Sequence, residues 1–173
     1  TGLPVSVSSK SESQDLCFVP DEGHAPLVES YHPELNRTGE IVDDSGRVLG
    51  DHAGYHRYTI GQRKGLGVAA ASRLYVKDID PAANRLVVGP RDELFTRRFR
   101  VDDIHWIAGV PPTEPMRCSI RVRYRTPAAD ADVDLHGGTS ASVRLDEPQF
   151  AVTPGQAAVF YDGDEVLGGG WSG

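Results

Sequence analysis

The chain has 173 residues, 39% of them hydrophobic, and a formal net charge of −7, a length that fits one ordinary domain or two small ones. The negative charge excludes a globally basic nucleic-acid binder. No apolar run approaches the roughly 18 residues of a membrane span, and the start shows no signal-peptide pattern, so we expect neither a membrane segment nor secretion. Nineteen glycines and twelve prolines indicate many turns and short strands.

Residues 1–30 are expected to form an irregular lead-in that carries Cys17. Its stretch from Ser6 to Gln14 is polar and low in complexity, which is typical of a flexible linker. Because the first residue is Thr1 rather than Met, we expect this start to be a cut or processed end.

Residues 31–95 are expected to form a small β-rich central domain. Short apolar runs flank an Asp-Asp-Ser-Gly turn and an Asp-Pro-Ala-Ala-Asn turn, the pattern of two hairpins. No stretch shows a convincing helical period. The strands predicted here are residues 40–42, 47–49, 55–60, 74–79 and 85–88.

Residues 96–173 are expected to form a C-terminal β-barrel domain. Turn signals recur at intervals of about ten residues, a spacing that fits a small barrel or sandwich. The chain is therefore predicted to be mainly β. The strands predicted here are residues 101–107, 119–125, 131–135, 140–145, 157–161 and 165–167.

The segment 119–125 alternates between apolar and arginine side chains, so its arginines share one face of a strand. Arginines spaced in this way suit bidentate contacts to successive phosphates of a nucleic acid. The same pattern also fits the solvated outer face of an edge strand, where charge deters aggregation. The arginines in question are Arg121, Arg123 and Arg125.

The loop 61–67 reads Gly-Gln-Arg-Lys-Gly-Leu-Gly, with Arg63 and Lys64 at its tip. Glycines permit a positive φ and a close approach of the backbone to a ligand, so this loop could hold a phosphate through backbone amides. It lacks the Walker A pattern. An ordinary long hairpin loop explains the residues equally well.

The two cysteines, Cys17 and Cys118, are too few and too far apart in sequence for a disulfide framework. We expect a cytosolic chain with reduced thiols. The sequence near Cys17 offers acids rather than the positive charge that activates a thiol, so local residues favour a small buried side chain. Cys118, beside the arginine segment, is expected to serve packing. The six histidines show no zinc-ligand spacing, and we expect no metal site.

Four segments together resemble the C-terminal portion of the bacterial tRNA-specific 2-thiouridylases. One surrounds a catalytic cysteine of that family, one is the signature of its central domain, and two belong to its last domain. Their order along the chain also agrees with the family. The segments are Ser13-Gln-Asp-Leu-Cys-Phe-Val19, Tyr58-Thr-Ile-Gly-Gln-Arg-Lys-Gly-Leu-Gly67, Met116-Arg-Cys with Arg121-Val-Arg-Tyr-Arg125, and Glu147-Pro-Gln-Phe-Ala-Val-Thr-Pro-Gly-Gln-Ala-Ala-Val-Phe-Tyr161 with Leu167-Gly-Gly-Gly170.

The resemblance implies an ATP-dependent tRNA sulfurtransferase that thiolates the wobble uridine at C2. It places Cys17 at the position of the cysteine that carries sulfur as a persulfide, and a second family cysteine then helps release that sulfur. It also implies a central β domain followed by a barrel similar to those of translation factors. Neither the family's ATP-binding Ser-Gly-Gly-x-Asp-Ser loop nor its other catalytic cysteine is present, so ATP with magnesium is assigned to an N-terminal domain outside this chain. We do not expect the 173 residues to thiolate tRNA alone.

For RNA contacts, the resemblance assigns Arg123, Tyr124 and Gln156 to the neighbourhood of the target base. Alternation puts Arg123 and Tyr124 on opposite faces, so a bulge or a strand end is needed for both to reach RNA. The expected partners are the anticodon region of tRNA and a sulfur-carrier protein, in the cytoplasm. Two alternatives stay open, a stand-alone RNA-binding β module with an inert cysteine and a protein-interaction barrel that binds no RNA.

Overall fold

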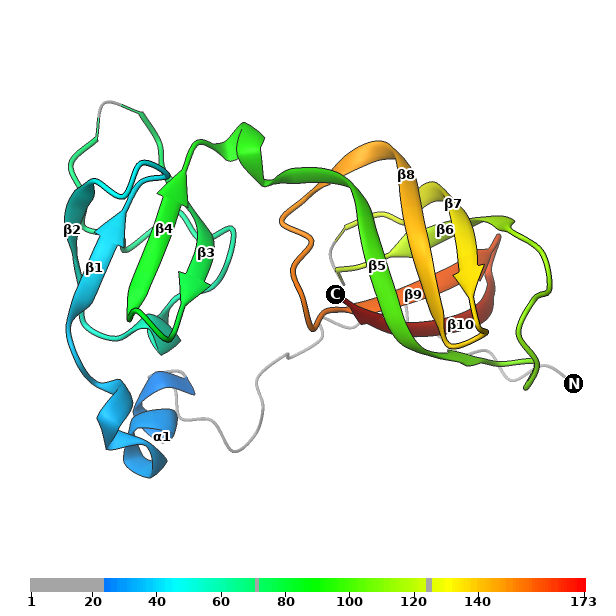
Figure 1. Ribbon diagram of the computed structural model, residues 1–173, viewed down its shortest axis with the longest axis horizontal. Coiled ribbons are helices and arrows are strands. Elements are labelled where there is room, and N and C mark those ends of the chain that lie inside the picture. The colour runs from blue at the N-terminus through cyan, green and yellow to red at the C-terminus, as the bar shows by residue number, and fades with distance from the viewer. Residues whose placement is uncertain (1–23, 71, 124–125) are drawn as a thin grey trace, which may run out of the picture. The chain divides into compact units, whose positions relative to one another are not determined.

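A computed structural model of the chain describes residues 24–70, 72–123 and 126–173. These residues form a four-stranded sheet and a closed six-stranded barrel (Figure 1). The prediction of a mainly β chain, with a small β-rich domain followed by a barrel, is confirmed. The domain boundaries predicted at residues 30 and 95 remain predictions.

The only α-helix among the described residues, α1 (His24–Tyr31), was not predicted. It is followed by a 3₁₀ turn, η1 (Pro33–Leu35), and both belong to a compact unit that ends at Arg37. Eight residues are too few to display a helical period, which explains the miss. One local signal was available, because Pro26 lies in the first turn of α1, where the missing N–H costs no hydrogen bond.

The sheet contains β1 (Gly39–Val42), β2 (Val48–His52), β3 (Tyr75–Asp80) and β4 (Arg85–Gly89), in the order β2-β1-β4-β3. The two predicted hairpins, β1–β2 and β3–β4, are antiparallel, and β1 and β4 join them in parallel. The side chain of Asp43 holds the first turn, since its Oδ1 accepts the backbone N–H groups of Ser45 and Arg47 at 3.0 and 3.1 Å.

The strand predicted over residues 55–60 is wrong. Gly54, at φ 142°, leads instead into a 3₁₀ turn, η2 (Tyr55–Arg57). Tyr55, Tyr58 and Ile60 pack against the buried side of the sheet, so the apolar pattern marks burial without a strand. The backbone meets a strand only just after this segment, where Gly61 donates its N–H to the carbonyl oxygen of Val76 at 2.8 Å.

His52 links the end of β2 to the β3–β4 turn from a buried position, with 2% of its surface exposed. Its Nδ1 accepts the N–H of Gly54 at 3.1 Å, and its Nε2 lies 3.2 Å from the carbonyl oxygen of Asn84. Because Nδ1 accepts, the neutral ring carries its proton on Nε2 and donates it to Asn84. Burial lowers the pKa of His52 below its ordinary value of 6.5.

We expect the sheet to lose stability as the pH falls below about 6.5, where unfolded histidine takes up a proton that buried His52 resists. The unfolded state then binds more protons than the folded state, so the free energy of unfolding falls with pH until the folded-state pKa is reached. Urea unfolding at pH 8 and pH 5 measures this loss. It should be smaller in His52→Gln than in the control His105→Gln, whose ring is exposed. Equal losses in both variants would contradict the assignment.

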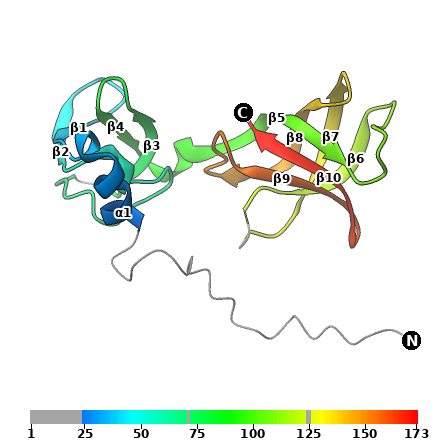
Figure 2. The ribbon, with the colours of Figure 1, turned by 90° about the horizontal axis from the view of Figure 1, so that it is seen from below.

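The barrel is built from six antiparallel strands, and each pairs with two neighbours in the order β10-β5-β8-β7-β6-β9 (Figures 1 and 2). A short 3₁₀ turn, η3 (Arg91–Leu94), leads into the first of them. All of these strands except β6 are longer than predicted. The strands are β5 (Phe95–Trp106), β6 (Met116–Arg121), β7 (Ala129–His136), β8 (Ser140–Phe150), β9 (Ala157–Asp162) and β10 (Glu165–Ser172).

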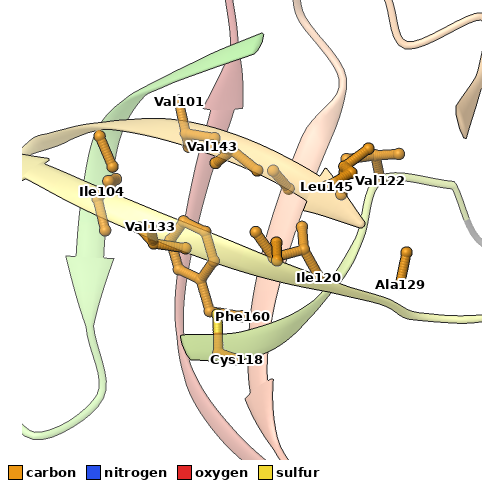
Figure 3. Close-up of a cluster of buried hydrophobic side chains, with 13 residues drawn as sticks. Val101, Ile104, Cys118, Ile120, Val122, Ala129, Val133, Val143, Leu145 and Phe160 are labelled. Atoms are coloured by element: carbon orange, nitrogen blue, oxygen red, sulfur yellow. The ribbon is translucent and has the colours of Figure 1, made fainter. Parts of the chain in front are cut away.

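Inward-facing side chains of all six strands fill the barrel (Figure 3). Phe160 is completely buried and stacks on Trp106, with ring centroids 5.5 Å apart. Cys118 belongs to the same core, with 6% of its surface exposed. Burial, followed by the charges of Asp162 and Asp130, raises the pKa of the Cys118 thiol to about 11. This thiol is therefore protonated at neutral pH and is a packing residue, as predicted.

Candidate functional site

Three of the predicted RNA-contact residues lie together on the barrel surface. Arg121, Arg123 and Gln156 line one hollow of about 570 Å³, where β6 and β9 pair. Its other walls come largely from β9, including Val159 and the ring of Tyr161. Sequence reasoning missed Tyr161, although its place opposite Ser119 in the β6–β9 register brings it next to Arg121.

Strand β6 ends at Arg121, four residues earlier than predicted. Val122 is still buried, but Arg123 belongs to a turn in which its carbonyl oxygen accepts the N–H of Thr126 at 3.1 Å. The strand therefore ends before Arg123. We expected either a bulge or a strand end here, so that Arg123 and Tyr124 could both reach RNA, and the structure has a strand end. Tyr124 and Arg125 lie outside the described residues.

The turn that carries Gln156 is tied to the last strand by the buried hydroxyl of Ser172. This hydroxyl donates to the carbonyl oxygen of Thr153 at 2.5 Å and accepts the N–H of Gln156 at 3.1 Å. Gly155, at φ 82°, makes the tight reversal between Pro154 and Gln156. The Thr-Pro-Gly-Gln motif thus builds a rigid turn at the edge of the hollow. The sequence held no signal for the role of Ser172.

The two arginines of the hollow lie near aromatic rings rather than carboxylates. The guanidinium carbon of Arg121 is 5.7 Å from the ring centroid of Tyr161, and that of Arg123 is 6.0 Å from the centroid of Phe150. Within the described part of the chain, neither forms an ion pair. Their charges are therefore available to an anion from outside the protein.

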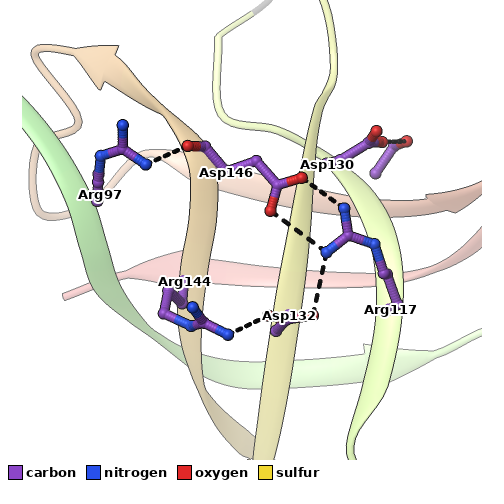
Figure 4. Close-up of polar contacts among 7 residues, drawn as sticks. Arg97, Arg117, Asp130, Asp132, Arg144 and Asp146 are labelled. Carbon is purple, nitrogen blue, oxygen red and sulfur yellow. Dashed lines mark hydrogen bonds and ion pairs between the residues drawn. The ribbon is translucent and has the colours of Figure 1, made fainter.

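Several arginines elsewhere on the barrel are neutralised, as Figure 4 shows for Arg97, Arg117 and Arg144 on the outer face of β5, β8, β7 and β6. Arg117 lies between Asp132 and Asp146, at 3.2 and 2.5 Å, and holds the pKa of the Asp146 carboxyl below its usual range. Arg144 also pairs with Asp132. Exposed pairs of this kind add little stability. Their relevance to the site is the contrast with Arg121 and Arg123, which have no such carboxylate partner among the described residues.

Known protein domains match most of the chain. A family model described as a tRNA methyl transferase PRC-barrel domain matches residues 27–90, and one described as an aminomethyltransferase β-barrel domain matches residues 96–171. The tRNA-specific 2-thiouridylase MnmA of Paramagnetospirillum magneticum is 48% identical over 165 residues, which are 95% of this chain and 44% of that protein. The proteins of the same name from Chlorobium luteolum and Synechocystis are each 46% identical, over 96% of this chain and 47% and 46% of their own lengths. The chain belongs to the tRNA-specific 2-thiouridylase family.

This chain spans a little under half the length of the 2-thiouridylases it matches. The residue that the family resemblance singles out for sulfur chemistry, Cys17, lies outside the described residues. Among those described, no three His, Cys, Asp or Glu side chains come together as a metal site would require. No helix in that part of the chain is long and apolar enough to span a membrane.

The glycine-rich loop 61–67 is held by the side chain of Gln62. The Gln62 side chain accepts the N–H of Thr59 at 3.1 Å and donates to the carbonyl oxygen of Lys64 at 2.9 Å. Leu66 is buried in the core of the sheet and anchors the loop from below. Arg63 and Lys64 are exposed at the tip, and their contact with RNA stays a prediction.

Proposed function

We propose that this chain forms the RNA-binding and sulfur-carrying part of a tRNA 2-thiouridylase, which thiolates the wobble uridine at C2. The observation that carries the proposal is the hollow that joins Arg121, Arg123 and Gln156 without a neutralising carboxylate. Membership of the 2-thiouridylase family supports tRNA as the RNA, and the anticodon region as the part bound. The chain is expected to act in the cytoplasm.

The residues of the hollow suit a nucleotide. A guanidinium forms paired hydrogen bonds to phosphate oxygens and stacks on flat rings, and the two arginines supply this chemistry from one side. The amide of Gln156 offers both a donor and an acceptor to a base edge. Val159 and Tyr161 supply apolar and aromatic surface against which a base or sugar packs.

Cys17 is the proposed sulfur carrier. Its thiolate attacks the outer sulfur of a persulfide on a donor protein, the S–S bond of the donor breaks and the donor cysteine leaves as a thiolate, so that Cys17 becomes the persulfide. In the family mechanism this persulfide is the form in which sulfur is delivered to tRNA. The residues present do not fit an ATP site of this family, because the Ser-Gly-Gly-x-Asp-Ser loop is absent from the sequence. Activation of the uridine is therefore assigned to a part of the enzyme beyond these residues.

The double variant Arg121→Gln, Arg123→Gln is expected to bind a tRNA anticodon stem-loop at least tenfold more weakly, since a hydrogen bond to a charged group contributes about 1.5–3 kcal/mol. Fluorescence anisotropy of the labelled RNA at fixed salt measures the affinity. The matched control is Arg117→Gln, Arg144→Gln, which removes the same charge from the ion-paired outer face. Unchanged affinity in the first pair would favour the protein-interaction barrel, and an equal loss in both pairs would show a nonspecific charge effect.

Incubation of the chain with polysulfide is expected to add one sulfur atom, about 32 Da, to the peptide that contains Cys17, and a thiol reductant should remove it. Mass spectrometry of the digested protein locates the addition. Cys17→Ser should abolish it and Cys118→Ser should retain it, because Cys118 is buried and its thiol is protonated. Sulfur found on Cys118, or on neither cysteine, would support the alternative of an RNA-binding module with an inert cysteine.

A further inference from the structure

A third arginine, Arg91, shares the arrangement of the two arginines in the hollow. Its guanidinium carbon is 4.8 Å from the ring centroid of Phe95 and 4.9 Å from that of Phe150. Arg91 lies on η3, just before the barrel, and it forms no ion pair with the described residues. Neither the sequence motifs nor the family resemblance pointed to it.

We propose that Arg91 extends the site into a continuous track that binds a single-stranded segment of RNA. The arginine–aromatic track consists of Arg91, Phe95, Phe150, Arg123, Arg121 and Tyr161. The inference rests on the proposed function, because it takes RNA binding at the hollow as given. It adds to that function the direction in which the bound RNA strand leaves the hollow, which is toward η3.

The track is continuous because each member lies near the next, either beside the same aromatic ring or as its partner on the adjacent strand. The ring of Phe150 lies near the guanidinium groups of both Arg91 and Arg123. The carbonyl oxygen of Phe150 also accepts a hydrogen bond from Nη1 of Arg123 at 3.5 Å. Phe95 and Phe150 are direct partners in the β5–β8 register, with ring centroids 5.5 Å apart. Arg123 and Arg121 line the same hollow, and Arg121 leads to Tyr161.

A surface that combines arginines with aromatic rings fits single-stranded RNA better than a duplex. In a single strand the bases are free to stack on guanidinium planes and rings, while the phosphates accept guanidinium N–H groups. A paired helix hides those base faces and presents only phosphates and sugars. Rings that hold the guanidinium groups in place also reduce the entropy lost when RNA binds.

The first test uses Arg91→Gln, with Arg144→Gln as the control of equal charge change on the ion-paired outer face. Fluorescence anisotropy with a fluorescein-labelled anticodon stem-loop should show about a fivefold to tenfold loss of affinity for Arg91→Gln and none for the control. Full affinity in Arg91→Gln, together with a loss in the Arg121→Gln, Arg123→Gln pair, would overturn the track and leave the proposed function standing. Failure of the parent chain to bind the stem-loop would contradict the proposed function itself.

The second test separates single-stranded from duplex binding. The stem-loop should compete with the labelled probe at least tenfold better than a fully paired duplex of the same length, because stacked bases contribute only in the single strand. Phe150→Leu, which leaves the charge unchanged, should reduce the preference for the stem-loop over the duplex. Thermal unfolding shows whether this variant is folded. Equal competition by the duplex would overturn the inference, and so would an unchanged preference in a folded Phe150→Leu chain.

Discussion

Replacing Phe160 with alanine is expected to destabilise the barrel by about 3–5 kcal/mol, a large share of the stability of a typical domain. The side chain is completely buried, and it lies on β9 opposite Ile120 of β6 and Gly168 of β10. Removal of the ring leaves a cavity against Trp106, on which it stacks, and rigid barrel strands cannot collapse to fill it.

Urea unfolding followed by tryptophan fluorescence measures this loss, since Trp106 reports directly on the stacked ring. The graded control is Phe160→Leu, which retains most of the volume and should cost no more than about 1.5 kcal/mol. A cost of Phe160→Ala below that of Phe160→Leu would contradict the placement of this ring at the centre of the core.

Replacing Gly168 with alanine is expected to cost about 3 kcal/mol, the upper end of the range for overpacking. A Cβ at this position would lie 2.6 Å from the carbonyl oxygen of His105 and 3.1 Å from Cε3 of Trp106. The first of these is backbone of the adjacent strand β5, so relief requires that β10 and β5 separate. The glycines of the Leu167-Gly-Gly-Gly170 motif thus allow the last strand to close the barrel.

A comparison of the melting temperatures of Gly168→Ala and Gly163→Ala separates the cost of a steric clash from the cost of a left-handed backbone. Gly163 has φ 57° with nothing within 4 Å of an added Cβ, so only the left-handed backbone penalty of about 1–2 kcal/mol applies there. The melting temperature should fall further in Gly168→Ala. A larger fall in Gly163→Ala would show that the β10–β5 contact tolerates a side chain.

Much of the strand framework was predictable because apolar runs alternate with turn residues. Both hairpins of the sheet and every barrel strand overlap their predicted ranges. The two errors have different physical origins. Residues 55–60 alternate as a strand would, yet they cover the sheet face without joining its ladder. The eight residues of α1 were too short for any periodic signal.

The candidate site was predictable where a motif specified it and unpredictable where distant segments meet. Arg121, Arg123 and Gln156 followed from local patterns and the family resemblance. Tyr161 and Arg91 could not, since their relation to the arginines depends on the β6–β9 pairing and on contacts with Phe150. The net charge of −7 was a poor guide to the local charge of the hollow, because several barrel arginines are neutralised by neighbouring carboxylates whereas, among the described residues, Arg121 and Arg123 are not.

The salt dependence of RNA binding tests the central claim most directly, because each arginine–phosphate contact releases counterions. For single-stranded RNA, the logarithm of the affinity should fall against the logarithm of salt concentration with a slope of about −0.7 per contact. The account predicts that Arg121→Gln, Arg123→Gln reduces the magnitude of this slope by about 1.4, whereas Arg117→Gln, Arg144→Gln leaves it unchanged. Identical slopes in the parent chain and the Arg121→Gln, Arg123→Gln variant would contradict the assignment of this hollow as the RNA site.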